Sequence, residues 1–423
     1  MRPRGSRSRG ADRSQTDSLE VEALSIVDAV VVGAGPAGCA SAITLAQSGR
    51  SVVVIDRATF PRDKFCGDGL TAGALRRLEA LGLDPLDVAS WHCVDDIIVR
   101  GPAGREVEFP LPRHQGQFAV VARRFDLDYA LVKRARGAGA RIHDGHAFRT
   151  ITIHEDHVEV TADGLEPVRA RFAIGADGMW SPLRKALGAT PDHYLGEWHA
   201  FRQYFTNVTG RAADKMIVWF EPSVLPGYVW SFPLGEGRAN VGFGVTRAGG
   251  LRTGAMNTQW PALLATPHIA AALGEHAIAE SPHRAWPIPA RIDKVSLTAP
   301  RTLFVGDAAA ATDLMTGEGI AQALLTGVLA ARAVVEGTTA DAVCREYKQS
   351  VERALFADHR MSVVLQSVLA RPRALDAAVR VAGVSGWTRR NFARWLFEDY
   401  PRAILLTPRR WRREMFGAAG AFS

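Results

Sequence analysis

A glycine-rich turn between two short apolar segments is the feature that most constrains the fold of this chain. Residues 27–55 read as a buried strand, an alanine-rich helix and a second buried strand, and Asp56 follows the second strand. The turn before the helix carries Gly33, Gly35 and Gly38 with the spacing GxGxxG. The first glycine permits a tight turn, the second lets backbone approach a pyrophosphate, and the third lets helix and strand pack, while the acidic residue accepts ribose hydroxyls. The sequence therefore predicts a dinucleotide-binding unit.

Composition excludes several other classes of protein. Hydrophobic residues make up 47% of the 423 residues and charged residues 22%, close to the globular average, which argues against a disordered chain. The four cysteines form neither a disulfide framework nor a zinc-ligand spacing, so we expect a reducing cytoplasm and no metal site. The longest uncharged stretch, residues 253–274, contains prolines and polar side chains, and we therefore expect no membrane-spanning segment.

Two further regions complete the pattern. Short β segments with aromatic residues and Gly/Pro turns indicate an antiparallel sheet, at residues 198–205, 216–221, 227–233 and 238–245. A late apolar strand at residues 301–305 runs into Asp307, and Gly319 lies at the start of an apolar helix that extends to residue 335. Backbone N–H groups at a helix start stabilise negative charge, whereas the alternative interpretation is a capped strand–helix junction.

Five segments together match a known family. They are VVGAGPAG at 31–38, PRDKFCGDGL at 61–70, GADGMWSPLR at 175–184, YVWSFP at 228–233 with GFG at 242–244, and GDAAAATDLMTGEGI at 306–320. In these segments the chain resembles the geranylgeranyl reductase family of FAD-dependent oxidoreductases, within the wider fold of the aromatic flavin hydroxylases. The resemblance implies an α/β fold with a Rossmann-type FAD-binding domain, interleaved with a substrate domain built on an antiparallel β-sheet, plus a C-terminal helical region.

The resemblance also implies which residues contact FAD. Those on the ADP half are Gly33, Gly35, Pro36, Ala37, Gly38, Asp56 and Arg57. The arginine that meets the FAD phosphates is Arg124, with Arg123 as the other candidate. The remaining contacts are Gly67, Asp68 and Gly69 beside the flavin, Asp307 at the ribityl chain and phosphate, Gly319 and Ile320 at the isoalloxazine, and Asp177, which supports both FAD and nicotinamide use. Because no second GxGxxG marks an NAD(P)H domain, the electron donor is either NAD(P)H or a reduced carrier protein.

Three residues are candidates for contact with the reacting double bond. Cys66 lies beside the flavin in the family, where it lines the pocket, donates a proton, or is buried without a chemical role. Tyr228, Trp230 and Phe232 alternate along a strand and therefore share one face. The resemblance implies that this face lines a hydrocarbon slot, and the alternative is an aromatic core face.

The predicted domain organisation is discontinuous. The FAD-binding domain comprises residues 25–95, 115–185 and 285–345, and the substrate-binding domain comprises residues 96–114 and 186–284. Residues 1–24 begin with five arginines among the first thirteen positions and lack the apolar stretch of a secretory signal, so we expect a disordered tail. Residues 346–423 form the C-terminal helical region.

The C-terminal region is strongly basic. Residues 371–423 contain eleven arginines and four acidic residues. Within the segment 387–400, Phe392, Trp395 and Leu396 share one helical face, and further arginines follow at Arg409, Arg410, Arg412 and Arg413. This composition fits a helix that lies on an anionic bilayer, and the alternative is a helix that caps a domain. No nucleic-acid-binding motif accompanies the charge, so we expect no nucleic-acid partner.

The resemblance implies an enzyme of the cytoplasm, peripheral to the inner face of the membrane if the basic C-terminus contacts it. It would reduce carbon–carbon double bonds in a prenyl chain, of geranylgeranyl or menaquinone type, carried by a hydrophobic or lipid substrate. The alternative is a flavin-dependent monooxygenase, epoxidase or dehydrogenase that tailors a secondary metabolite, because the fold supports all of these. A halogenase is disfavoured, since residues 286–289 (WPIP) only superficially match the WxWxIP signature. A flavin-bearing scaffold without turnover is the third class.

Overall fold

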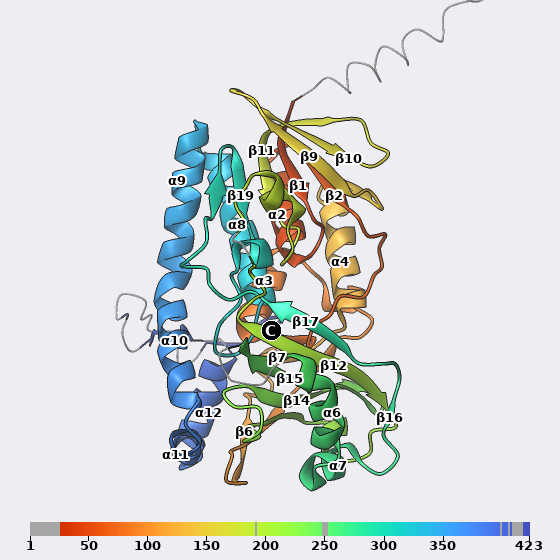
Figure 1. Ribbon diagram of the computed structural model, residues 1–423, viewed down its shortest axis with the longest axis vertical. Helices are drawn as coiled ribbons and strands as arrows, with labels where there is room; N and C mark the ends of the chain where they lie inside the picture. Colours follow the sequence, from red (N-terminus) through yellow and green to blue (C-terminus); the bar gives the residue numbers. More distant parts are fainter. Residues whose placement is uncertain (1–25, 191–192, 248–252, 398–399, 405–406, 408–417) are drawn as a thin grey trace, which may run out of the picture.

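The computed structural model describes residues 26–190, 193–247, 253–397, 400–404, 407 and 418–423. The predicted tail at residues 1–24 and the four arginines between 409 and 413 lie outside these ranges. Figure 1 shows an upper part built on a parallel sheet and a lower part built on an antiparallel sheet, with long helices along one side of both. Within the described ranges no helix is long and apolar enough to cross a membrane.

The upper part contains the predicted strand–helix–strand unit. Strand β1 (Val27–Val32) runs parallel to β2 (Val52–Asp56) on one side and β11 (Val168–Gly175) on the other, and α2 (Pro36–Gln47) connects β1 to β2. The other strands of this sheet are β8 (Arg141–Asp144), β9 (Phe148–Ile153), β10 (Val158–Ala162), β18 (Thr298–Ala299) and β19 (Thr302–Phe304). The dinucleotide-binding topology expected from the sequence is therefore confirmed.

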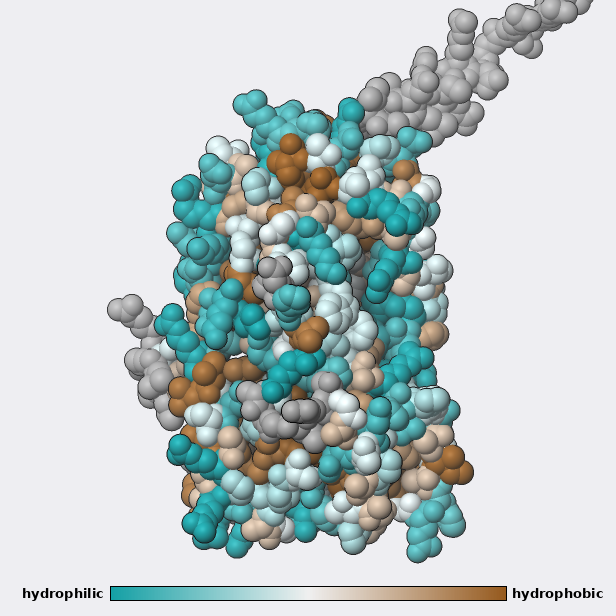
Figure 2. Space-filling model, viewed as in Figure 1, coloured by the Kyte–Doolittle hydropathy of each residue, from teal (hydrophilic) through white to brown (hydrophobic). Residues whose placement is uncertain are grey.

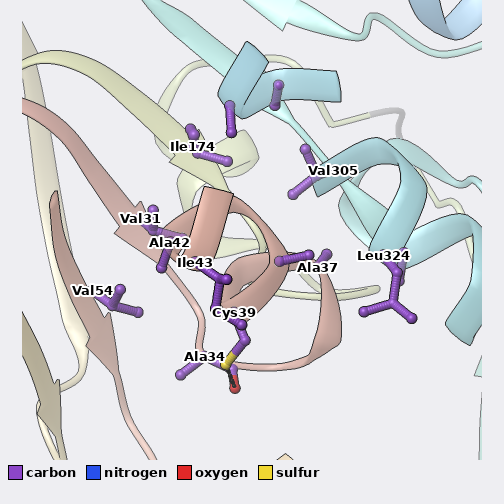
Figure 3. Close-up of a cluster of buried hydrophobic side chains, with 14 of the residues drawn as sticks. Val31, Ala34, Ala37, Cys39, Ala42, Ile43, Val54, Ile174, Val305 and Leu324 are labelled. Atoms are coloured by element: carbon purple, nitrogen blue, oxygen red, sulfur yellow. Dashed lines mark hydrogen bonds between the residues drawn. The ribbon is translucent and has the colours of Figure 1, made fainter. Parts of the chain in front are cut away.

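Helix α2 is packed between α4 (Arg124–Gly137) and α8 (Ile320–Glu336). Figure 3 shows side chains from β1, α2, β2 and β11, such as Val31, Ile43, Val54 and Ile174, meeting in one apolar cluster. Small residues let the helices approach closely, because a Cβ at Gly327 would overlap a backbone carbonyl of α2. Burying each of the larger side chains contributes on the order of 2 kcal/mol, and this core fixes the glycine turn at the end of β1.

The lower part is an antiparallel sheet with one covered face. Its strands run in the order β16-β12-β15-β14-β13-β5-β6, with β17 beside β12: β16 (Ile278–Ala279), β12 (Trp198–Thr206), β15 (Arg238–Thr246), β14 (Tyr228–Gly235), β13 (Met216–Trp219), β5 (Asp96–Arg100), β6 (Glu106–Pro110) and β17 (Arg284–Ile288). Only β13 and β5 pair in parallel. Helices α6 (Met256–Leu264) and α7 (Pro267–Leu273) bury the odd-numbered side chains of β12 and β15, for example Phe201 and Phe243. The even-numbered side chains consequently face the upper part of the molecule.

Strand β17 belongs to the antiparallel sheet, because it pairs with β12 over its whole length. Its residues 285–288 were expected to be part of the FAD-binding domain. The segment has no distinctive alternation, so only the pairing identifies its sheet. The domain boundaries stay predictions.

Shorter elements and the C-terminal helices join the two parts. A three-stranded sheet of β3 (Gly69–Thr71), β7 (Ala119–Val121) and β4 (His92–Cys93) lies beside α3 (Ala72–Ala80), with η1 (Pro85–Asp87) and α5 (Pro182–Ala186) in the connections. Short helical turns also occur at η2 (Arg211–Ala213), η4 (Thr253–Ala255) and η5 (Gly306–Ala309). After α8, the chain continues through α9 (Ala340–Val351), η6 (Glu352–Phe356), α10 (Ala357–Leu369), α11 (Pro372–Ala382) and α12 (Gly386–Leu396). Figure 1 shows α9 and α10 running along the left side, from the upper sheet to the lower one.

Candidate active site

A cavity of about 1270 Å³ lies between the two sheets. It extends from the glycine turn after β1 to the aromatic face of β14 and to helices α10, α11 and α12. Pockets for one small ligand usually occupy about 300–1,000 Å³. The cavity is therefore large enough to take a dinucleotide and part of a second ligand together.

The glycine turn forms the dinucleotide end of the cavity. Gly33 has φ +104°, and a Cβ there would overlap the carbonyl oxygen of Ala176. Gly38 does not line the cavity but packs on the turn, where a Cβ would overlap the carbonyl oxygen of Gly33. Gly35 is the N-cap of α2, no side chain caps this helix start, and a Cβ at Gly35 would meet only Arg62, at 3.8 Å. The turn thus offers open backbone N–H groups at a helix N-terminus, which favours an anionic phosphate.

Asp56 fixes this turn as well as lining the cavity. Its carboxylate accepts hydrogen bonds from the backbone N–H of Ala34 at 2.6 Å and of Ala58 at 2.8 Å. Pro36, Ala37 and Arg57, which the family pattern also predicts at the ADP half, line the cavity too. Six of the seven residues predicted for the ADP half therefore lie on the cavity wall, and the seventh, Gly38, packs against the turn outside the cavity.

Basic side chains gather beside the turn. Arg124 forms a two-point ion pair with Asp128, at 2.6 and 2.8 Å, and Arg62 binds the same carboxylate at 2.6 Å. Although burial opposes ionisation of Asp128, these two guanidinium groups hold its pKa below the usual range. Lys64 lines the cavity as well, with its Nζ 4.1 Å from the centre of the Trp286 ring, and burial lowers its pKa.

The structure separates the two candidate phosphate arginines. Arg124 is buried and lines the cavity. Arg123 is absent from the cavity wall and pairs with Asp126 at 3.2 Å instead. The position of Arg124 fits the predicted role, and that role stays a prediction.

The opposite wall carries the late strand–helix junction. Asp307, Gly319 and Ile320 line the cavity, with Gly319 as the N-cap of α8. Asp177 also lines it, but its carboxylate accepts hydrogen bonds from the Ser181 hydroxyl at 2.6 Å and the Leu183 N–H at 2.9 Å. Burial raises the pKa of Asp177 to about 6. This side chain therefore orders the start of α5, and the cofactor contact predicted for it stays untested.

A buried polar network holds the loop of Cys66, Gly67, Asp68 and Gly69 against the antiparallel sheet. The amide of Asn240 donates to the carbonyl oxygen of Cys66 at 3.0 Å and to the carboxylate of Asp68 at 2.8 Å. Tyr204 donates to the same carboxylate at 2.6 Å, and Asp68 has φ +64°. Burial raises the pKa of Asp68 to about 6 in spite of these donors. The carboxylate of Asp68, predicted to contact the cofactor, is thus bound to the sheet on one side while the residue lines the cavity.

Cys66 lies at the junction between the polar and the apolar parts of the cavity. The guanidinium of Arg124 is beside its thiol, which favours the thiolate, but burial has the larger effect and raises the pKa of Cys66 to about 11. The side chain is therefore a neutral thiol at physiological pH. A neutral thiol can line the pocket or donate a proton, and it is not a ready nucleophile.

The predicted aromatic face borders the cavity. Tyr228, Trp230 and Phe232 all line it, with neighbouring ring centroids 6.0 and 6.2 Å apart. The indole N–H of Trp230 donates to Asn240 at 3.0 Å, and the Tyr228 hydroxyl donates to the carbonyl oxygen of Thr316. Burial raises the pKa of Tyr228, so the phenol stays protonated. The Tyr228 hydroxyl and the Trp230 indole N–H are therefore both hydrogen-bonded within the protein. The two side chains expose mainly apolar ring surface to the cavity.

Beyond this face the cavity continues as an apolar branch. It passes between the sheet and the C-terminal helices, and its wall includes Val99, Met216, Val218, Phe220, Leu365, Leu369, Leu375, Val379, Phe392 and Trp395. None of the charged residues on the described cavity wall comes from β5, β13, β14 or the helices α10–α12. The branch therefore suits a neutral hydrocarbon and excludes a charged group.

Helix α12 corrects part of the membrane prediction. Phe392, Trp395 and Leu396 line the cavity, and the Phe392 ring lies 5.0 Å from that of Phe109 on β6. This face is therefore turned inward and is not available to a bilayer, as the capping alternative predicts. The amphipathic pattern locates an apolar face but not its partner.

Sequence reasoning missed several residues of the site. Arg62 and Lys64 precede Cys66 in the PRDKFCGDGL segment, so their charge was a usable signal. The sequence carries no such signal for Asn240 and Tyr204, because their role depends on β12 and β15 lying over the Cys66 loop. The apolar branch likewise depends on helices far along the chain.

The residues present fit FAD. The uncapped start of α2, the glycines that leave the turn open and the basic groups beside it match a diphosphate, and Asp56 lies where a ribose would follow. The cavity continues past Asp307 and Gly319 to Cys66, which leaves room for the isoalloxazine between the two sheets.

Comparison with known proteins agrees with this assignment. The family model described as FAD binding domain matches residues 26–359. The chain is 36% identical over 334 residues to a menaquinone reductase of Mycobacterium tuberculosis, covering 72% of this chain and 75% of that protein. It is 32% identical over 343 residues to a digeranylgeranylglycerophospholipid reductase of Methanopyrus kandleri, covering 77% and 82%.

Solved structures share the fold at lower identity. A geranylgeranyl bacteriochlorophyll reductase-like protein of Thermoplasma acidophilum superposes with a TM-score of 0.74 at 22% identity, over 91% of this chain and 99% of that one. The halogenase PltM reaches a TM-score of 0.67 at 18% identity, over 90% of this chain and 87% of that one. These two likenesses establish the architecture alone. The family model and the two sequence relatives, by contrast, show that the chain belongs to the geranylgeranyl reductase family of FAD-binding oxidoreductases.

Proposed function

We propose that this protein uses FAD to reduce carbon–carbon double bonds in a prenyl chain borne by a quinone or a lipid. The observation that carries the proposal is the two-part cavity, in which a phosphate-binding turn continues into an uncharged branch with Cys66 at the junction. The relatives named for menaquinone and digeranylgeranylglycerophospholipid reduction support the same chemistry. Their substrates share a long neutral isoprenoid, which suits the branch.

The chain's own residues would bind, orient and protect the reacting groups. When bound, FAD supplies the hydride for the alkene. The apolar branch orients the substrate by burying its hydrocarbon and keeps water from the junction. Asn240 holds the backbone of the Cys66 loop in place, and Arg124 lies beside the thiol. Cys66 forms part of the pocket wall there, and its proton remains available because the thiol is neutral.

Anaerobic turnover tests the reaction class. Reduced enzyme is incubated in an oxygen-free chamber with a geranylgeranyl lipid, which has no quinone ring to accept the hydride, and the mass of the product is measured by mass spectrometry. A reductase gives a product heavier by about two mass units without oxygen. A product heavier by about sixteen units, formed only with oxygen, would assign the chain to the monooxygenase alternative instead.

The electron donor and the location form the finer part of the proposal. We infer that electrons come from NAD(P)H acting transiently or from a reduced carrier protein. A prenyl lipid resides in a bilayer, so the enzyme would work from the cytoplasm at the inner face of the membrane. Measuring flavin bleaching with NADH, NADPH or reduced ferredoxin under nitrogen identifies the donor.

A further inference from the structure

The apolar branch of the cavity reaches the molecular surface between α10 and α11. Val368 on α10 and Ala378 on α11 both line the cavity. The side chain of Val368 is also 37% exposed, and Ala378 is exposed as well. Residues that face the cavity and the solvent at once mark an opening, and these two come from helices that contact each other.

Exposed apolar side chains occur on the same two helices and on the segment that follows α11. Val364 is 58% exposed, Val381 65%, Val384 74% and Trp387 65%. Half of the twelve large hydrophobic residues that are exposed in the described chain lie between positions 363 and 387. Figure 2 shows hydrophobic residues on the surface over α10, at the left edge of the molecule. Single exposed hydrophobic residues are normal, whereas a gathered group marks an interaction site.

The same helices are positively charged. Residues 357–397 contain seven arginines and two aspartates. On α10, Arg360, Val364 and Val368 recur at spacings of four, so they share one face of the helix. Arg371 follows the end of α10, as the N-cap of α11. Both aspartates are occupied by backbone donors: Asp358 accepts from the N–H of Ala403 at 2.9 Å, and Asp376 from that of Ala103 at 3.0 Å.

We propose that this surface, formed by Val364, Val368, Val381, Val384 and Trp387 with the arginines around it, docks on an anionic lipid bilayer. Charge complementarity and the continuity of the surface with the apolar branch select this partner. Trp387 suits the headgroup region, and the valines suit the acyl boundary. The purpose of the contact rests on the proposed function, because a prenyl chain could then pass from the bilayer into the cavity without crossing water. The surface does not include the inward face of α12.

Vesicle binding tests the docking surface without requiring turnover. FAD-loaded full-length protein is sedimented with vesicles of phosphatidylcholine alone or with 30% phosphatidylglycerol, at low salt. Wild type is expected to bind the anionic vesicles, and the double variant Val364→Asp/Val381→Asp to bind them at least about tenfold more weakly. The matched control is Leu86→Asp/Ile278→Asp, which places two aspartates at exposed apolar positions elsewhere, 92% and 59% exposed, and is expected to bind as wild type does.

Several results would overturn the proposal. Wild type that ignores anionic vesicles, or equal losses in both double variants, removes the lipid partner. If the Val364→Asp/Val381→Asp change instead converts a dimer to a monomer in light scattering while vesicle binding is unaltered, the surface binds a second copy. Activity on a short soluble prenyl analogue is measured alongside. If a variant no longer binds vesicles but still reduces the soluble analogue, the docking proposal is supported. If none of the proteins, wild type included, reduces the analogue, the proposed function is refuted, and the vesicle-binding result is judged separately.

Discussion

Replacing Asp68 with asparagine tests how burial governs the loop beside the candidate site. Asp68 is fully buried, and its pKa rises from 3.8 to about 6 because burial outweighs the donors Tyr204 and Asn240. A carboxyl group whose pKa is higher in the folded state binds its proton more tightly there, so protonation favours folding. Its contribution to stability is therefore present at low pH and is lost as the pH rises through about 6.

The rise corresponds to roughly 3 kcal/mol between the protonated and ionised limits. About 2 kcal/mol of this falls between pH 4.5 and pH 8. Because asparagine does not titrate, Asp68→Asn is expected to gain about 2 kcal/mol of unfolding free energy relative to wild type over that interval. Asp177 titrates in the same window but is common to both proteins, so its effect cancels.

Urea denaturation at a series of pH values, with saturating FAD, measures the difference. The control is Asp87→Asn, which removes a carboxyl group from a side chain that is 57% exposed. A wild-type-minus-variant difference that is constant with pH, or that changes in the opposite direction, would refute the reasoning.

The remaining predictions concern the turn, the thiol and the network. Gly35→Val is expected to fold, since a Cβ there meets only Arg62, but to lose FAD. Gly38→Val is expected to misfold, because its side chain would overlap Gly33. Flavin content and circular dichroism distinguish the two variants, and full flavin occupancy in Gly35→Val would contradict the assignment. Cys66→Ala is expected to keep kcat within about tenfold, as for a pocket-wall residue; a loss of about 10²-fold or more in stopped-flow turnover would make the thiol the proton donor. Asn240→Leu is expected to lower the unfolding free energy by about 3 kcal/mol, since it leaves the buried Trp230 indole N–H and the Cys66 carbonyl without this hydrogen-bond partner. A melting temperature equal to that of wild type would show that the network does not contribute to stability.

Local patterns predicted the strand–turn–helix unit that begins the upper sheet. Gly33, Gly35, Gly38 and Asp56 lie within thirty residues, so their arrangement follows from one strand–turn–helix unit whose geometry is nearly invariant. The alternation of Tyr228 and Trp230 likewise required only the two-residue period of a strand.

Features that depend on long-range packing could not be predicted in the same way. Asp68 meets Tyr204 and Asn240, which are 136 and 172 residues away along the chain. The apolar face of α12 was visible as a pattern, but whether Phe392 meets a bilayer or the β6 strand is decided by tertiary packing. The sheet to which β17 belongs could not be read from its residues for the same reason, since its partner β12 lies some eighty residues earlier.

Single-turnover oxidation of the reduced enzyme tests the central claim most directly. The FAD-loaded protein is reduced under nitrogen and mixed in a stopped-flow instrument with a prenyl lipid that has no quinone ring, or with its fully saturated counterpart, and flavin absorbance is followed. The account predicts that the unsaturated chain reoxidises the flavin and gains two hydrogens, while the saturated chain leaves the flavin reduced. Flavin that stays reduced with every prenyl substrate, and reoxidises only when oxygen is admitted, would contradict it.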